Sequence, residues 1–121
     1  MDKMLSGRRL LVVEDEMLIL MTIEDMLGEL GCASVKGAAT VDKALALMVG
    51  EDFDAAMLDV NLNGEKSYPV ADALAARDVP FFFSTGYSDS TIGEDYPGRP
   101  VLTKPYRYED LVAMLTRLLP R

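Results

Sequence analysis

The chain contains no histidine and no tryptophan among its 121 residues, and Cys32 is its single cysteine. Without histidine, the chain has no imidazole for acid–base catalysis, few ligands for a transition metal and no phosphohistidine of its own. One cysteine cannot form an internal disulfide, and the stretch "MDKMLSGRR" lacks the apolar segment of a secretory signal. We therefore expect a reducing, cytoplasmic location.

Long apolar runs and an excess of positive charge are also absent from the sequence. No run approaches the roughly 20 apolar residues that a membrane-spanning helix needs, so we expect no membrane partner. The net charge of -8 repels nucleic acid and anionic lipid, so we expect no nucleic-acid binding by this domain. Half of the residues are hydrophobic, which suits one globular domain over residues 1–121.

Short apolar segments alternate with helical patterns along the chain. Apolar residues at helical spacing predict a helix over residues 16–31, with Gly31 as its C-terminal cap. Thr40 is predicted to cap the helix that follows it. Strands are expected at residues 9–13, 33–39, 53–60, 79–85 and 99–103. The other expected helices are 41–50, 68–78 and 107–119, and residues 86–98 are expected to form a short helix at most.

This alternation predicts an α/β fold with a parallel sheet and helices on both of its faces. In such sheets, binding sites form beyond the carboxyl ends of the strands, near the point where the strand order reverses. Four predicted strands end in polar or charged residues, namely Glu14-Asp15, Asp59, Thr85 and Lys104-Pro105. Each of these has an ordinary structural explanation by itself, as a helix cap, a strand end or a solvated loop residue.

Together these strand ends favour chemistry on a phosphoryl group. Carboxylates gathered in a small space repel one another unless a cation lies among them. Magnesium prefers oxygen ligands and keeps several waters, which leaves room for phosphate oxygens. A lysine and a hydroxyl facing the same point would stabilise a phosphoryl group during its transfer. The pattern therefore indicates phosphoryl transfer to a carboxylate.

The chain resembles the receiver domains of two-component response regulators over essentially its whole length. The resemblance rests on "VVEDE", "AAMLDVN", "FFFSTGY" and "VLTKPY", in this order and each at the end of its own strand. It implies a flavodoxin-like (βα)5 fold with the strand order 2-1-3-4-5. It also implies a signalling domain rather than an enzyme, phosphorylated by a sensor histidine kinase or a histidine phosphotransfer protein and acting on a downstream protein partner.

The resemblance also implies a role for each site residue. Asp59 would be the phosphoacceptor, Thr85 would bond one phosphoryl oxygen and Lys104 would pair with another. The expected cofactor is Mg²⁺, and its implied ligands are Glu14, Asp15, Asp59 and the backbone carbonyl of Asn61. The stretches "FSTGY" and "KPY" resemble a subgroup named for a Phe-Ala-Thr-Gly motif, common among alphaproteobacterial stand-alone and stress-response regulators, with Ser84 here in place of the alanine.

Two departures from the commoner receiver pattern affect the expected switching. Val101 stands where most receivers carry a rotating aromatic ring, three residues before the lysine. Asn63-Gly64 replaces a proline after the acceptor, which suggests a longer and looser third loop. We therefore hypothesise that activation orders residues 86–98, with Tyr87 or Tyr106 as the aromatic reporter.

Three alternative functions remain open from the sequence. The first is a receiver-fold interaction module that is never phosphorylated. The second is an aspartyl-phosphate hydrolase, but the second aspartate of that class is replaced by Asn61 here. The third is a flavodoxin-like cofactor binder, which the lack of tryptophan and of a glycine-rich loop after the first strand disfavours.

Overall fold

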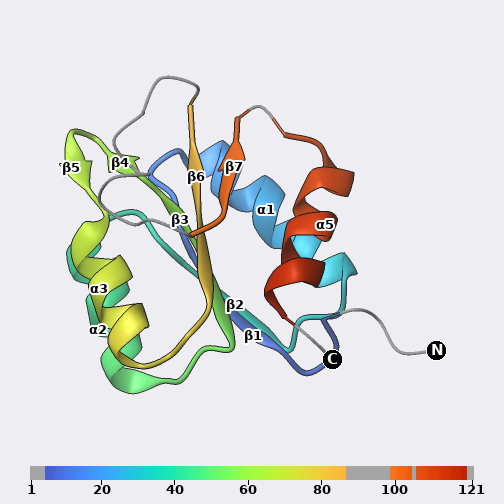
Figure 1. Ribbon diagram of the computed structural model, residues 1–121, viewed down its shortest axis with the longest axis horizontal. Helices are drawn as coiled ribbons and strands as arrows, with labels where there is room; N and C mark the ends of the chain where they lie inside the picture. Colours follow the sequence, from blue (N-terminus) through green and yellow to red (C-terminus); the bar gives the residue numbers. More distant parts are fainter. Residues whose placement is uncertain (1–4, 87–98, 105, 120–121) are drawn as a thin grey trace.

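A five-stranded parallel sheet forms the centre of the chain in a computed structural model, which describes residues 5–86, 99–104 and 106–119. Its strands lie in the order β2-β1-β3-β6-β7, as Figure 1 shows. This confirms the predicted order 2-1-3-4-5 when the main strands are counted along the chain. The strands are β1 (Arg9–Val13), β2 (Ser34–Ala38), β3 (Ala55–Asp59), β6 (Phe81–Thr85) and β7 (Val101–Thr103).

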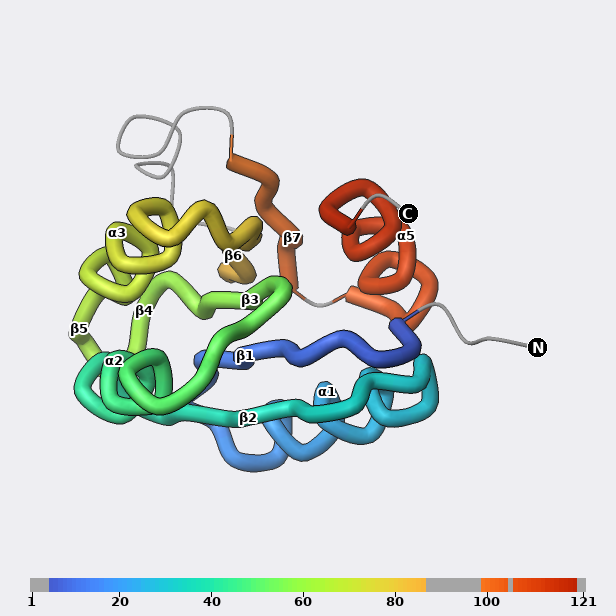
Figure 2. The backbone as a smooth tube through the Cα atoms, turned by 90° about the horizontal axis from the view of Figure 1, so that it is seen from below, coloured from blue at the N-terminus to red at the C-terminus, as the bar shows by residue number. Residues whose placement is uncertain are grey.

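Helices cover both faces of this sheet (Figures 1 and 2). On one face lie α2 (Val41–Gly50) and α3 (Tyr68–Ala76), and on the other lie α1 (Met17–Glu29) and α5 (Tyr108–Leu118). A separate apolar cluster fills each interface between sheet and helices. The chain is therefore doubly wound, as the alternation of patterns predicted.

The helix signals in the sequence are confirmed at single residues. The apolar residues predicted to share one face of α1 are all buried, namely Leu20, Ile23, Leu27 and Leu30. Gly31 follows this helix with a positive φ of 96°, a conformation that glycine adopts without the steric cost of a Cβ. The Thr40 hydroxyl accepts a hydrogen bond of 3.1 Å from the backbone N–H of Lys43 and so caps α2.

The run of phenylalanines forms the buried strand β6. Phe81, Phe82 and Phe83 are each 0% exposed, because both faces of this central strand are covered by helices. Phe81 and Phe83 pack in the cluster below α2 and α3, whereas Phe82 packs in the cluster below α1 and α5. Successive side chains alternate between the faces of a strand, so Ser84 lies on the α1/α5 face, like Phe82.

The third loop is tighter than the sequence analysis expected. Two short antiparallel strands, β4 (Asn61–Leu62) and β5 (Glu65–Lys66), pair in it as a hairpin. Asn63 and Gly64 connect them with positive φ values of 52° and 91°. Asn-Gly is the preferred pair for such a two-residue turn, so the prediction of a loose loop is wrong.

Two further expectations concern the segment of residues 86–98 and membrane insertion. Apart from Gly86, the segment expected to hold at most a short helix, residues 86–98, lies outside the described residues. No helix in the described part of the chain is long and apolar enough to cross a membrane.

Candidate functional site

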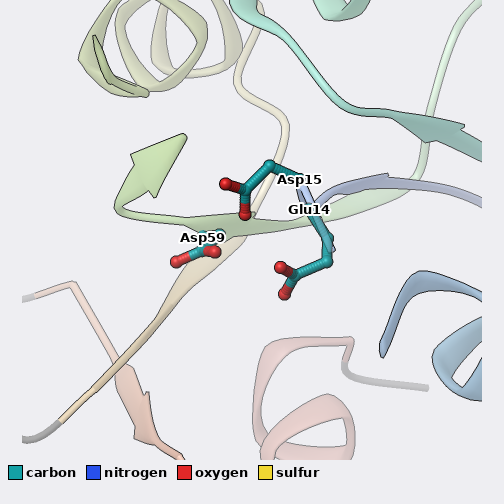
Figure 3. A group of neighbouring side chains, drawn as sticks. All are labelled: Glu14, Asp15 and Asp59. Atoms are coloured by element: carbon teal, nitrogen blue, oxygen red, sulfur yellow. The ribbon is translucent and has the colours of Figure 1, made fainter. Parts of the chain in front are cut away.

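Three acidic side chains meet at the carboxyl ends of the two central strands β1 and β3. Glu14 and Asp15 directly follow β1, and Asp59 is the last residue of β3. One carboxylate oxygen from each lies within 4.8 Å of the others, and Figure 3 shows the three side chains around a common space. The strand order reverses between β1 and β3, so the acids lie at the position where doubly wound sheets form sites.

Lys104 reaches the same place from the end of β7. Its Nζ donates to Glu14 Oε1 at 2.9 Å and to Asp59 Oδ2 at 3.2 Å. The backbone N–H of Lys104 donates to the carbonyl of Thr85 at 2.7 Å, which anchors this end of β7 to β6. The structure therefore brings together residues from strand ends that are far apart in the sequence.

The electrostatics of the site follow from its burial. Glu14 is only 2% exposed, and burial raises its pKa to about 7; a hydrogen bond from Lys104 opposes this rise and the charge of Asp59 adds to it. Burial also raises the pKa of Asp59 above its ordinary value, although the charge of Lys104 opposes this. Burial alone would lower the pKa of Lys104, but its hydrogen bond to Glu14 and the charge of Asp59 outweigh burial and raise it.

Burial disfavours ionised carboxyl groups, and it is the main cause of the raised pKa values of Glu14 and Asp59. Among the described residues, the ammonium group of Lys104 bonds two of the three neighbouring carboxyl groups, those of Glu14 and Asp59. A hard divalent cation would supply the missing charge and would accept oxygen ligands from all three acids. The donor set therefore fits Mg²⁺.

Asn61, the fourth predicted ligand, lies two residues beyond Asp59 in strand β4 of the hairpin. Its side chain is exposed, and its Oδ1 accepts a hydrogen bond of 2.8 Å from the backbone N–H of Gly64. The side chain is therefore engaged in the hairpin turn. The role expected for its backbone carbonyl stays a prediction.

Thr85 ends β6, next to the acidic cluster. It is partly buried and pairs with Thr103 of β7, while the residue before it, Ser84, pairs with Asp59 of β3. The role of its hydroxyl toward a phosphoryl oxygen stays a prediction.

Two buried hydroxyls lie beside the charged residues. Ser84 is 1% exposed, and neither its Oγ nor the Tyr106 hydroxyl has a hydrogen-bond partner among the described residues. Burial raises the pKa of Tyr106 to about 12, against the opposing influence of the Lys104 charge and of the nearby Ser84 hydroxyl. The two hydroxyls are thus close neighbours without a hydrogen bond of normal geometry between them.

The sequence analysis named Ser84 and Tyr106 separately but did not predict that they lie together. It also missed a contact of the hairpin with the acids: the backbone N–H of Asn63 donates to Asp15 Oδ2 at 3.0 Å. The Asn63-Gly64 pair was the available signal for this contact, because it predicts a tight hairpin directly after the strand that ends in Asp59.

Comparisons with known proteins agree with this arrangement. The model of the response regulator receiver domain matches residues 10–116. The solution structure of SdrG from Sphingomonas melonis Fr1 is 48% identical, covers 93% of this chain and 96% of that chain, and has a TM-score of 0.81. The BeF3-activated conformation of SdrG from Pseudomonas melonis Fr1 is 47% identical, with a TM-score of 0.80 and coverage of 96% and 99%.

A curated relative is longer than this chain. The transcriptional regulatory protein TcrA of Mycobacterium tuberculosis is 35% identical over 96% of this chain, and the chain spans 47% of the length of TcrA. Since the family match covers most of the residues and includes all three strand ends that carry the acids and the lysine, this chain belongs to the response regulator receiver domain family.

Proposed function

We propose that Asp59 is the phosphoacceptor of this receiver domain and that the phosphoryl group comes from a phosphohistidine of a partner protein. The observation that supports this most directly is the position of Asp59, which ends β3 beside two other acids and accepts a hydrogen bond from Lys104. These 121 residues contain no histidine, so the donor imidazole lies outside this domain, and we propose that it belongs to a sensor histidine kinase or a histidine phosphotransfer protein.

The transfer is an in-line displacement at phosphorus. An Asp59 carboxylate oxygen forms the new O–P bond as the N–P bond of the phosphoimidazole breaks, and the imidazole nitrogen keeps the electron pair and takes a proton. Lys104 already bonds Asp59 and would pair with a phosphoryl oxygen as its charge develops. Thr85, one residue beyond the register partner of Asp59, would bond a second phosphoryl oxygen.

The residues proposed to hold Mg²⁺ are Glu14, Asp15, Asp59 and the backbone carbonyl of Asn61. The bound ion would neutralise negative charge on the phosphoryl oxygens. The support for this site is the excess of carboxyl groups over ammonium groups and the raised pKa of Glu14. In the absence of the ion, Lys104 provides part of the neutralising charge through its bonds to Glu14 and Asp59.

Phosphorylation would then change a surface that a downstream protein recognises. Val101 is 38% exposed on β7, and no rotating aromatic ring is available at that position. We propose that Thr85 and Lys104 carry the signal instead, since their main chains are joined by the 2.7 Å hydrogen bond. We further propose that residues 1–121 form one domain with a cytoplasmic location. This domain would assist its own phosphorylation without being an enzyme.

The test is phosphorylation by acetyl phosphate in the presence of Mg²⁺, measured as a mass shift of the intact protein. The wild type should gain one phosphoryl group and Asp59→Asn should gain none. Asp52→Asn removes an exposed carboxylate of the same type and should be labelled like the wild type. Full labelling of Asp59→Asn would refute the assignment, and a wild type that is never labelled would favour the unphosphorylated interaction module.

A further inference from the structure

The β4–β5 hairpin is bonded directly to the acidic cluster. The main-chain N–H of Asn63, at the tip of the hairpin, donates to Asp15 Oδ2 at 3.0 Å. Asp15 lies beyond the last residue of β1, in the loop before α1, where the sheet no longer orients it. The hairpin therefore supplies a fixed hydrogen-bond donor to the carboxylate of Asp15, which belongs to a loop and not to a strand or helix.

The base of the hairpin is attached to the central sheet. The N–H of Val60 donates to the carbonyl of Ser84 at 3.1 Å, and the N–H of Ser67 donates to the carbonyl of Val60 at 3.0 Å. Val60 is 0% exposed and directly follows Asp59. Because its base is held on buried strands, the hairpin can hold its tip at a defined position over the acids.

The tip keeps its shape through backbone conformation and one side chain. Asn63 and Gly64 both have positive φ values, which a two-residue turn between right-twisted strands requires. The Oδ1 of Asn61 accepts the N–H of Gly64 at 2.8 Å and closes this turn from the side. The chain of contacts therefore runs from the Asn61 side chain through the turn to the carboxylate of Asp15.

We propose that this hairpin is a positioning element of the magnesium site, acting through the Asn63 main-chain N–H on Asp15. The inference rests on the proposed function, since it takes Asp15 as a metal ligand. A carboxylate that is already oriented by a hydrogen bond loses less freedom when it binds a metal, and its remaining lone pairs stay available to the ion. Asn61 then has a second role, because its side chain supports the turn while its backbone carbonyl is the proposed ligand.

This proposal makes a distinctive prediction for Gly64. An added Cβ at Gly64 would meet no atom within 4 Å, so alanine there is opposed only by the φ of 91°. Gly64→Ala should therefore disturb the turn without a steric clash and weaken Mg²⁺ binding by about tenfold, the size typical for the loss of a group that orients a metal ligand. Gly64→Asn should bind Mg²⁺ nearly as well as the wild type, because asparagine tolerates positive φ.

The chain offers a matched control at Gly7. This residue also has a positive φ, of 79°, and an added Cβ there also meets no atom within 4 Å. Gly7 precedes β1, whereas Glu14 and Asp15 follow the opposite end of that strand. Gly7→Ala therefore imposes the same kind of backbone strain away from the site, and it should lower thermal stability while leaving the Mg²⁺ affinity unchanged.

The experiment is a Mg²⁺ titration of EDTA-treated protein, followed by amide chemical shifts in NMR spectra. Asn61→Ala is the second variant, which keeps the backbone carbonyl but removes the acceptor of the Gly64 N–H; it too should bind about tenfold more weakly. If Gly64→Ala does not fold, Asn61→Ala alone provides the test. Wild-type affinity in both variants would overturn the inference and leave the metal site standing. A wild type that binds no Mg²⁺ would overturn the proposed metal site itself.

Discussion

Replacement of Lys104 by methionine tests the electrostatic account of the site. Methionine keeps an unbranched apolar stem of similar reach but removes the ammonium group that bonds Glu14 at 2.9 Å and Asp59 at 3.2 Å. The side chains of these acids are only 2% and 11% exposed, so water cannot replace the lost partner well. Lys104→Met should therefore destabilise the metal-free protein.

The magnitude follows from the burial of the pairs. Removing one partner of a buried ion pair costs about 3–5 kcal/mol. Lys104 itself is 22% exposed, so solvent screening reduces this, and we expect a loss of about 2–3 kcal/mol in the free energy of unfolding at pH 8. At pH 6, which is below the pKa of about 7, Glu14 carries a proton in the wild type and needs the lysine less. The loss should then be about 1 kcal/mol smaller.

Urea denaturation of metal-free protein at both pH values measures these differences. Lys43→Met is the control, because Lys43 is an exposed residue of α2, and it should change the free energy of unfolding by less than about 0.5 kcal/mol at either pH. Equal losses for Lys104→Met at pH 6 and pH 8 would show that the lysine acts through packing rather than charge. Adding Mg²⁺ should reduce the loss, since the ion supplies the missing positive charge.

Two further predictions concern the buried polar groups. Burial raises the pKa of Glu14 to about 7 from the ordinary value of 4.5, so the folded state binds the proton more tightly than the unfolded state does. Metal-free stability should therefore fall as the pH rises between these values. Mg²⁺ affinity should rise over the same pH range. Glu14→Gln should abolish the fall in stability between these pH values. If the stability of that variant still falls in the same way, the titrating group is not Glu14. Ser84→Ala removes a buried hydroxyl without a partner among the described residues and should stabilise the protein by up to about 1 kcal/mol in thermal unfolding. A loss of more than 1 kcal/mol would instead show that the hydroxyl is hydrogen-bonded in solution, for example to Tyr106.

Much of the fold could be predicted because its signals are local. The helical spacing of Leu20, Ile23 and Leu27 predicted which face of α1 is buried, and Thr40 predicted the start of α2. The Asn63-Gly64 pair was expected to loosen the third loop, and this expectation was wrong. The commoner receiver pattern has a proline at this place, and its replacement suggested a loose loop. In the structure, Asn63 and Gly64 instead adopt positive φ values and close a hairpin.

The clustering of the three acids could be predicted from the sequence, but the contacts that they make could not. A parallel sheet brings the carboxyl ends of its strands to one edge, so acids at the ends of β1 and β3 were expected to lie near each other. The hydrogen bond from Asn63 to Asp15 joins residues 48 positions apart, and no local pattern predicts its geometry. The neighbouring hydroxyls of Ser84 and Tyr106 were missed for the same reason.

The sequence alone therefore determined the order of strands and helices, the strand ends that carry the acids and the lysine, and the lack of a histidine donor. These depend on residue type and spacing, which act over a few residues along the chain. The tertiary structure decided that Lys104 bonds Glu14 across 90 positions, that Glu14 has the pKa of about 7, and that the hairpin tip bonds Asp15. Burial and distance between remote residues set these properties, and both exist only once the sheet has assembled.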